Sequence, residues 1–180
     1  MNRAIVDVDG TLWDFHTRLG EVLNELYEIP SGLAVKSTEW DWHKQFITDE
    51  QFYHAVDLVH DDQQSSEPYD HATELFDMLD YCGFETIVAS HRRPQRAADL
   101  AAWITLHVSD KWTGMYSGSD KKFLIRERNL LIDDNPKTIL YAEAVGATAY
   151  TLKWKWNEES PAERFSNLKI MTQEIKKRYA

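Results

Sequence analysis

Short apolar runs alternate with amphipathic stretches along the chain. The runs are too short for helices and predict buried strands at residues 3–8, 84–90, 112–116, 129–132 and 147–152. Apolar residues recur at helical spacing over 94–106 and 137–145, and these stretches predict intervening helices. Strands that alternate with helices in this way predict a parallel sheet with helices on both faces. The expected fold class is therefore a three-layer α/β arrangement.

A long segment separates the first two expected strands and exceeds the length of a single crossover helix. Its pattern predicts helices at residues 13–28, 48–60 and 68–82. Residues 34–47 form an irregular aromatic stretch. The expected organisation is a core of residues 1–12 and 81–180, with residues 13–80 as an insert.

Two capping boxes mark expected helix starts. Thr48 and Gln51 form the first, at the start of the second helix of the insert. Ser160 and Glu163 form the second, with Pro161 at the first helical position, and predict a final helix that ends near Tyr179.

Length and composition narrow the class of protein. The 180 residues suffice for one domain with a substantial insert. No apolar run reaches about 18 residues and no apolar segment precedes Asp7, so neither a membrane span nor a signal peptide is expected. Cys82 is the single cysteine, which excludes an internal disulfide and favours the reducing cytoplasm. The net charge of -10 argues against long nucleic acid as a partner, but a small phosphorylated ligand needs only a local basic cluster.

Acidic and hydroxyl side chains interrupt the apolar runs where three of the expected strands end. Asp7 and Asp9 close the first strand, Ser90 closes the second, and Asp133 and Asp134 follow the fourth. Because ligands of such sheets bind beyond the carboxyl ends of the strands, four carboxylates are expected to converge there. Charges this close need a cation, and oxygen ligands without a cysteine or histidine pair favour Mg²⁺.

These motifs resemble those of the haloacid dehalogenase (HAD) superfamily of phosphotransferases. The matching residues, in order, are Asp7-Val8-Asp9-Gly10-Thr11, Ser90, a lysine at Asp120-Lys121-Lys122, and Asp133-Asp134. Within the superfamily the chain is most similar to the 5'(3')-deoxyribonucleotidase group, over roughly residues 5–152. The resemblance implies a Rossmann-like, HAD-like core with a small helical cap inserted after the first strand.

The resemblance also implies a magnesium-dependent phosphomonoester hydrolase that works through an aspartyl phosphate. Asp7 would attack phosphorus, and Asp9 would protonate the leaving oxygen and then activate water. Ser90 would hydrogen-bond the phosphoryl oxygens, and Lys121 would neutralise charge on the phosphate and the nucleophile.

The remaining residues of the motifs are expected to hold the metal and the phosphate. The metal ligands would be Asp7, Asp9, Asp133 and Asp134. The phosphate would meet Gly10, Thr11, His91 and Arg92. Other basic residues could neutralise this charge in place of Lys121. They are Lys122 and the arginines after the second strand, Arg92, Arg93 and Arg96.

The insert is expected to supply selectivity, because a phosphate site built from strand ends does not distinguish leaving groups. Rings are abundant in the insert: some would form the core of a small cap, and one or two would stack on a base. Phe15, Trp40 and Trp42 are the leading candidates for that stacking, and His16, next to the first motif, is a further candidate for the cleft. The expected substrate is a small phosphorylated molecule, with a nucleoside monophosphate as the first choice.

Two alternatives stay open. The enzyme could be a phosphatase for another small metabolite or for a nucleic acid end, although the net charge of -10 weighs against the last. In a different class, the chain could be a non-catalytic phosphate-binding domain. Asp9 argues against that class, because the second acid of the first motif matters only for turnover.

Overall fold

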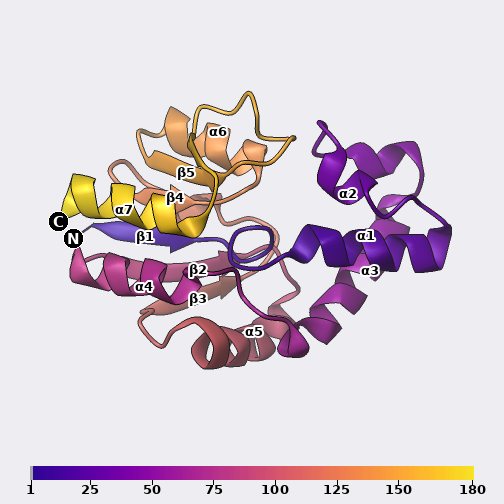
Figure 1. The fold of residues 1–180 in the computed structure, drawn as a ribbon, viewed down its shortest axis with the longest axis horizontal. Helices are drawn as coiled ribbons and strands as arrows, with labels where there is room; N and C mark the ends of the chain where they lie inside the picture. Colours follow the sequence, from indigo (N-terminus) through magenta and orange to yellow (C-terminus); the bar gives the residue numbers. More distant parts are fainter. Residues whose placement is uncertain (1) are drawn as a thin grey trace.

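The computed structural model describes residues 2–180, and its core is a six-stranded sheet (Figure 1). The strands are β1 (Arg3–Val6), β2 (Glu85–Ser90), β3 (Gly114–Ser117), β4 (Leu130–Ile132), β5 (Thr148–Leu152) and β6 (Glu163–Phe165). They pair in the order β3-β2-β1-β4-β5-β6, and every pair is parallel. The strand order reverses its direction between β1 and β4, and ligands of open parallel sheets bind at such a point.

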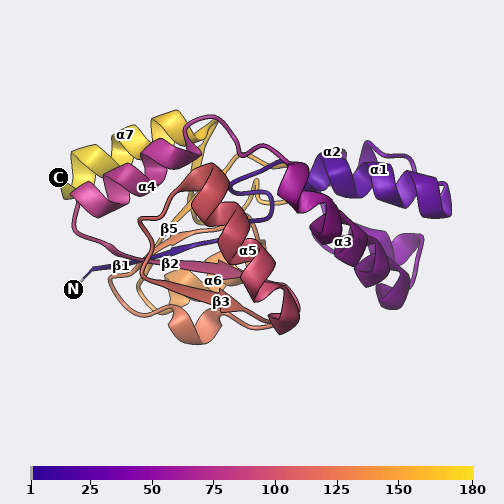
Figure 2. The ribbon, with the colours of Figure 1, turned by 90° about the horizontal axis from the view of Figure 1, so that it is seen from below.

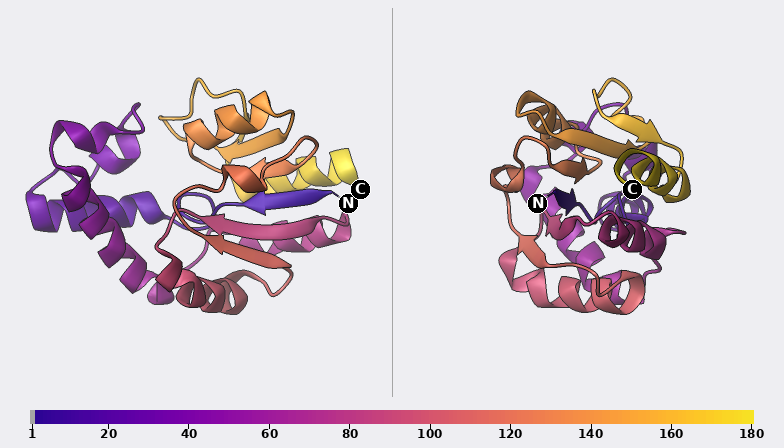
Figure 3. Two further views of the ribbon diagram at one scale, coloured as in Figure 1. Left: turned by 180° about the vertical axis from the view of Figure 1, so that it is seen from behind. Right: turned by 90° about the vertical axis from the view of Figure 1, so that its left-hand side faces the viewer.

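Helices cover both faces of the sheet, as the alternating pattern predicted. One face is covered by α4 (Ala72–Tyr81), α5 (Ala97–Trp103) and α7 (Leu168–Tyr179), whose apolar residues form one core cluster with Ala4 and Val6 of β1. The other face carries α6 (Pro136–Ala144), which joins Ile5 of β1 in a second cluster. Figure 2 shows α4 and α7 side by side above the sheet, and the end view of Figure 3 shows the layers. The expected three-layer α/β fold is therefore confirmed.

The helices of the insert project beyond the carboxyl ends of the strands (Figure 1). They are α1 (Phe15–Tyr27), α2 (Leu33–Lys36) and α3 (Asp49–Asp62), and α1 packs against both of the others. We call residues 15–62 the cap. The expected insert at residues 13–80 also includes α4, but α4 packs against α7 and β2 in the core. The part of the insert that stands outside the core therefore ends before α4.

Short irregular helices complete the fold. Four are 3-10 helices, at Trp42–Gln45, Gln63–Ser65, Pro94–Arg96 and Lys122–Leu124, and a π-helical turn at Ile104–Val108 extends α5. Among residues 2–180, no helix combines the length and the apolar composition that crossing a membrane requires.

Three helix starts differ from the sequence expectation: α1 starts at Phe15, α4 at Ala72 and not at Pro68, and the last helix at Leu168. Asp14 caps α1 by accepting a hydrogen bond from the Thr17 amide, so Trp13 precedes the helix. The predicted capping box at Ser160–Glu163 is wrong, because Glu163–Phe165 forms strand β6. Pairing with β5, together with burial of Phe165 against Tyr150 at a ring distance of 5.0 Å, outweighs the local helix signal. The last helix starts only after Asn167.

Candidate active site

Three buried carboxylates meet where β1 and β4 end. Asp7 follows β1 directly, and Asp133 and Asp134 follow β4. The ladder pairs Val6 with Ile132, and the Asp7 amide donates to the Ile132 carbonyl at 2.8 Å, so the sheet register itself brings the acids together. One carboxylate oxygen from each of the three lies within 4.8 Å of the others. Burial of like charges at this distance is unfavourable unless a cation accompanies them.

Lys121 supplies a positive charge to this group. It lies in the loop after β3, is 1% exposed, and its ammonium pairs with Asp7 and with Asp133, the latter at 2.8 Å. Burial alone would lower the pKa of Lys121, but the charges of Asp133 and Asp7 outweigh it and raise that pKa. Burial is also the main cause that raises the pKa of Asp7, and Lys121 only partly opposes it. Lys121 thus lies at the acids, whereas the Lys122 ammonium lies over the Tyr141 ring.

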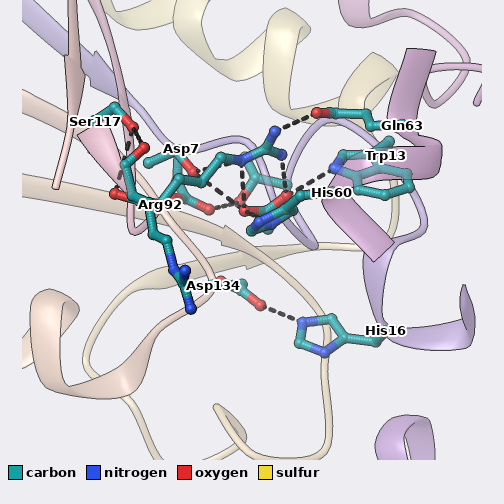
Figure 4. Close-up of polar contacts among 12 residues, drawn as sticks. Asp7, Trp13, His16, His60, Gln63, Arg92, Ser117 and Asp134 are labelled. Atoms are coloured by element: carbon teal, nitrogen blue, oxygen red, sulfur yellow. Dashed lines mark hydrogen bonds and ion pairs between the residues drawn. The ribbon is translucent and has the colours of Figure 1, made fainter. Parts of the chain in front are cut away.

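Asp9 belongs to a separate network beside the three acids. The Arg92 guanidinium pairs with it, the His60 imidazole lies 3.1 Å from Oδ2, and the Trp13 indole donates to Oδ1 at 2.9 Å (Figure 4). The Ser90 hydroxyl donates to Oδ2 at 3.1 Å. Burial opposes ionisation, but the charges of Arg92 and His60 outweigh it and hold the pKa of Asp9 well below its ordinary value. Of the four carboxylates expected to share one metal, three come together and Asp9 lies outside their group.

Arg92 is the buried member of the arginines that follow β2. Its side chain is 2% exposed, and it also donates to Ser90 Oγ at 3.1 Å and to the side chain of Gln63, the residue directly after the cap. Arg93 and Arg96 instead pair with the cap carboxylates Asp57 and Asp61. The structure therefore places both Lys121 and Arg92 at the acids, on different carboxylates.

The turn after β1 shapes the space above the acids. Gly10 has a φ of 72°, and a Cβ there would lie 2.5 Å from Asp134 Oδ2 and 2.6 Å from His16 Nε2. Thr11 is buried, with its hydroxyl 3.5 Å from Asp7 Oδ2. His91 is exposed on the wall of the cavity described below. Position 10 requires glycine, both because its φ is positive and because Asp134 and His16 approach it so closely.

Several residues of the site were not identified from the sequence. The Trp154 indole donates to the Gly10 carbonyl at 3.0 Å, and the Trp156 indole donates to the Asp134 carbonyl at 3.2 Å. Both tryptophans follow β5, so the rule that functional residues follow the strands could have found them. His60 had no such signal, because it lies at the end of a cap helix and reaches Asp9 only through the tertiary fold.

A cavity of about 990 Å³ lies between the cap and the strand ends, with Asp7, Asp9, Asp133 and Asp134 among its lining residues. All three rings expected to meet a base line it: Phe15, Trp40 and Trp42. Phe15 and Trp42 are each only 7% exposed, whereas Trp40 is half-buried. Other rings on the wall are Phe52, Tyr53, Tyr116 and Trp156. Trp40 therefore offers the largest accessible face among the three expected rings.

Solved structures of haloacid dehalogenase-like hydrolases share this fold. A protein described as a predicted phosphoglycolate phosphatase from Haemophilus somnus 129PT is 18% identical, with a TM-score of 0.66 and 95% of this chain and 98% of that chain covered. A haloacid dehalogenase-like family hydrolase from Streptococcus pneumoniae is 17% identical, with a TM-score of 0.64 and coverage of 96% and 98%. A predicted phosphatase from Clostridium acetobutylicum is 14% identical, with a TM-score of 0.71 and coverage of 97% of both chains.

The chain therefore has the fold of the haloacid dehalogenase-like hydrolases. No protein-family model matches the sequence, and no curated protein sequence matches it significantly. The three structural relatives named above are not described as nucleotidases, so the narrower resemblance to deoxyribonucleotidases stays a prediction.

The buried pair of Asp9 and Arg92 generates a prediction about stability. Arg92→Ala is expected to lower the free energy of unfolding by about 3–5 kcal/mol near pH 7, because it leaves a buried carboxylate without its main cation. The pKa of Asp9 is lowered in the folded protein, so the pair stabilises the fold above the ordinary aspartate pKa of about 3.9. That stabilisation is lost as the pH falls through the folded-state pKa. Urea unfolding should therefore show a larger difference from wild type at neutral pH than at pH values well below the ordinary aspartate pKa.

Arg93→Ala is the matched control. Arg93 is the residue directly after Arg92, and it forms an exposed pair with Asp57. Its expected cost is below about 1 kcal/mol. Equal losses in the two variants would show that burial of Arg92 adds nothing to the pair.

Proposed function

We propose that the protein is a magnesium-dependent phosphomonoester hydrolase that works through an aspartyl phosphate on Asp7. The observation that carries the proposal is the group of Asp7, Asp133 and Asp134 against Lys121, on the floor of a cavity that also holds Asp9. A nucleophile, an acid-base residue and charge compensation are the parts that phosphoryl transfer needs.

The three clustered carboxylates fit a hard divalent cation. All the donors are oxygens, which Mg²⁺ prefers. Oδ2 of Asp133 is buried and has the Lys121 ammonium, 2.8 Å away, as its ion-pair partner. Asp7, Asp133 and Asp134 would hold the ion, which when bound supplies charge stabilisation to the phosphoryl oxygens.

The chain's own residues would carry the two chemical steps. In the first, an Asp7 oxygen attacks phosphorus, the ester P–O bond breaks, and Asp9 gives its proton to the leaving oxygen. In the second, Asp9 takes a proton from water as that water attacks phosphorus, which releases inorganic phosphate and restores Asp7. The partners of Asp9 lower its pKa and favour the ionised form that the second step requires, whereas the first step requires Asp9 to carry a proton when substrate is bound.

Positive and hydroxyl groups around the acids would hold the phosphoryl group in line with Asp7. The Lys121 ammonium touches Asp7 and compensates the charge that repels an incoming phosphate. Ser90 and Arg92 lie beside Asp9, and their hydroxyl and guanidinium groups would donate to phosphoryl oxygens. A non-catalytic phosphate-binding domain would need these donors but would not need Asp9.

The size and wall of the cavity favour a nucleoside monophosphate. About 990 Å³ lies at the upper end of the range for ligand pockets and far exceeds the volume of a phosphate. Two of the cations on the wall, Lys137 and Arg93, are paired with Asp41 and Asp57 of the cap, which leaves them less available to a second anionic group. An uncharged aromatic leaving group suits this wall. The phosphatase for another small metabolite is the second candidate, since the Haemophilus relative is described as a predicted phosphoglycolate phosphatase.

Asp7→Asn is expected to reduce turnover to the background rate, because the amide does not form the covalent intermediate. Phosphate release from a generic aryl phosphate and from nucleoside monophosphates, with magnesium present, measures this. Asp110→Asn, an exposed aspartate remote from the cavity lining, should keep the wild-type rate. Circular dichroism should show that both variants fold. Turnover by Asp7→Asn above a trace would contradict the nucleophilic role.

Activity is expected to require a divalent cation. Exhaustive chelation should abolish turnover, and added Mg²⁺ should restore it. Asp133→Ala should weaken Mg²⁺ binding, measured by titration calorimetry, more than Ser90→Ala does, because Ser90 contacts Asp9 and not the three clustered acids. Full activity after chelation would refute the metal site.

Trp40→Ala is expected to raise the KM for a nucleoside monophosphate by about tenfold to a hundredfold, because a stacked ring contributes roughly 1–3 kcal/mol per base. The rate on a generic aryl phosphate should barely change. Phe46→Ala is the control, since Phe46 is an exposed ring of the same cap segment outside the cavity lining. If Trp40→Ala slows both substrates equally, its ring serves the cap alone and a sugar phosphate becomes the better substrate.

A further inference from the structure

A histidine from the cap reaches the group of clustered acids. His16 lies in the first turn of α1 and is buried, and its Nε2 lies 2.8 Å from Oδ2 of Asp134. Since a carboxylate only accepts, the Nε2–H donates. Figure 4 shows this contact apart from the network around Arg92 and His60. His16 is therefore a cap residue that touches one of the three carboxylates that we assign to the metal.

Aromatic rings fix the orientation of the His16 imidazole. The ring of Trp156 lies 4.4 Å from it, and that of Trp154 lies 5.4 Å away. These two indoles are stacked on each other at 4.8 Å with an interplanar angle of 8°. Phe15 and Trp40 contact the imidazole from the cap side, at 5.3 and 6.3 Å. The imidazole thus has little freedom to turn away from Asp134.

The same indoles tie down the backbone that His16 faces. Trp156 donates to the Asp134 carbonyl at 3.2 Å, so the ring packed on the imidazole also holds the residue that the imidazole binds. Trp154 donates to the carbonyl of Gly10, whose missing side chain leaves the room for the contact between His16 and Asp134. The imidazole, its partner and its surroundings form one connected unit.

We propose that His16 is a positioning residue for the metal site: its hydrogen bond to Oδ2 orients the Asp134 carboxylate toward the ion that Asp7 and Asp133 share with it. The inference rests on the proposed metal-dependent function. Hydrogen-bond partners of metal-binding carboxylates typically contribute about 10–100-fold in metal affinity, because they restrict the ligand to its binding orientation. The cap then contributes to metal affinity as well as to selectivity.

His60 provides a matched comparison within the same cap. It is also buried and also contacts a site carboxylate, but that carboxylate is Asp9, outside the group of three. A general effect of cap docking would act through both histidines. An effect of carboxylate orientation at the metal would act through His16 alone.

The test is titration calorimetry of the metal-free full-length protein with MgCl₂ in the absence of substrate. His16→Ala should raise the Kd for Mg²⁺ by about 10–100-fold, and His60→Ala should leave it within about twofold of wild type. His16→Gln, which keeps a donor near the Nε2 position, should recover most of the affinity. His16→Phe keeps a ring packed against the tryptophans and removes only the donor, so it should bind as weakly as His16→Ala. The comparison of His16→Phe with His16→Gln decides the question even if His16→Ala does not fold.

Failure of the inference and failure of the proposed function have different signatures. If the wild-type protein does not bind Mg²⁺, the proposed metal site is refuted, and the inference with it. If the wild-type protein binds and His16→Phe binds equally well, His16 has no positioning role while the proposed function stands. If His60→Ala weakens binding as much as the His16 variants do, cap docking and not the hydrogen bond to Asp134 sets the affinity, and the inference is refuted.

Discussion

Repulsion among Asp7, Asp133 and Asp134 is the constraint on which the rest of this structure depends. The parallel pairing of β1 with β4 fixes the backbones that carry these acids, so the three side chains start from neighbouring positions. Their charges must be compensated where they lie. Lys121, in the loop after β3, provides part of this compensation. Because its burial alone would lower its pKa, the raised pKa is due to the carboxylates. A divalent ion would complete the compensation that a single ammonium begins.

Asp9, two residues after Asp7, has its charge compensated by a different set of partners. Its partners come from three parts of the chain: Arg92 from the loop after β2, His60 from α3, and Trp13 from the connection into the cap. They keep the carboxylate ionised and fixed, whereas burial makes ionisation of Asp7 unfavourable. Two acids with opposite pKa shifts and only one intervening residue are suited to different chemical roles. Attack on phosphorus requires ionised Asp7, so Lys121 and a bound cation would have to offset the burial that disfavours this form.

Much of this arrangement could be predicted from the sequence, because strand ends carry their chemistry locally. The strands and the positions of Asp7, Ser90 and Asp133 follow from short apolar runs that polar residues interrupt, and the parallel topology then brings them to one edge. Strand β6 was missed because the helix-start signal at Ser160–Glu163 overlaps its first residue, and only pairing with β5 overrides it. Residue spacing along the chain could not show whether Lys121 or Arg92 lies at the acids, because that depends on the distances between loops in the folded protein. His60 was missed because the cap meets the core only through tertiary packing.

Residues at the two ends of the cap sequence and residues in its interior make different contacts. His16 and His60 lie near the points where the chain enters and leaves the cap, and both hold carboxylates of the core. Tyr53 and Lys44 lie in the interior of the cap sequence and line the cavity without a hydrogen bond or ion pair to the acids. Changes at the two histidines should therefore act on the chemical step or the metal, and changes at the interior positions on the leaving group. A cap built this way can exchange its wall residues for a new substrate while the acids keep their partners, because the two sets of contacts share few side chains. Trp40 and Phe15 are exceptions, since each lines the cavity and also contacts the ring of His16, so their replacement tests how independent the two sets are.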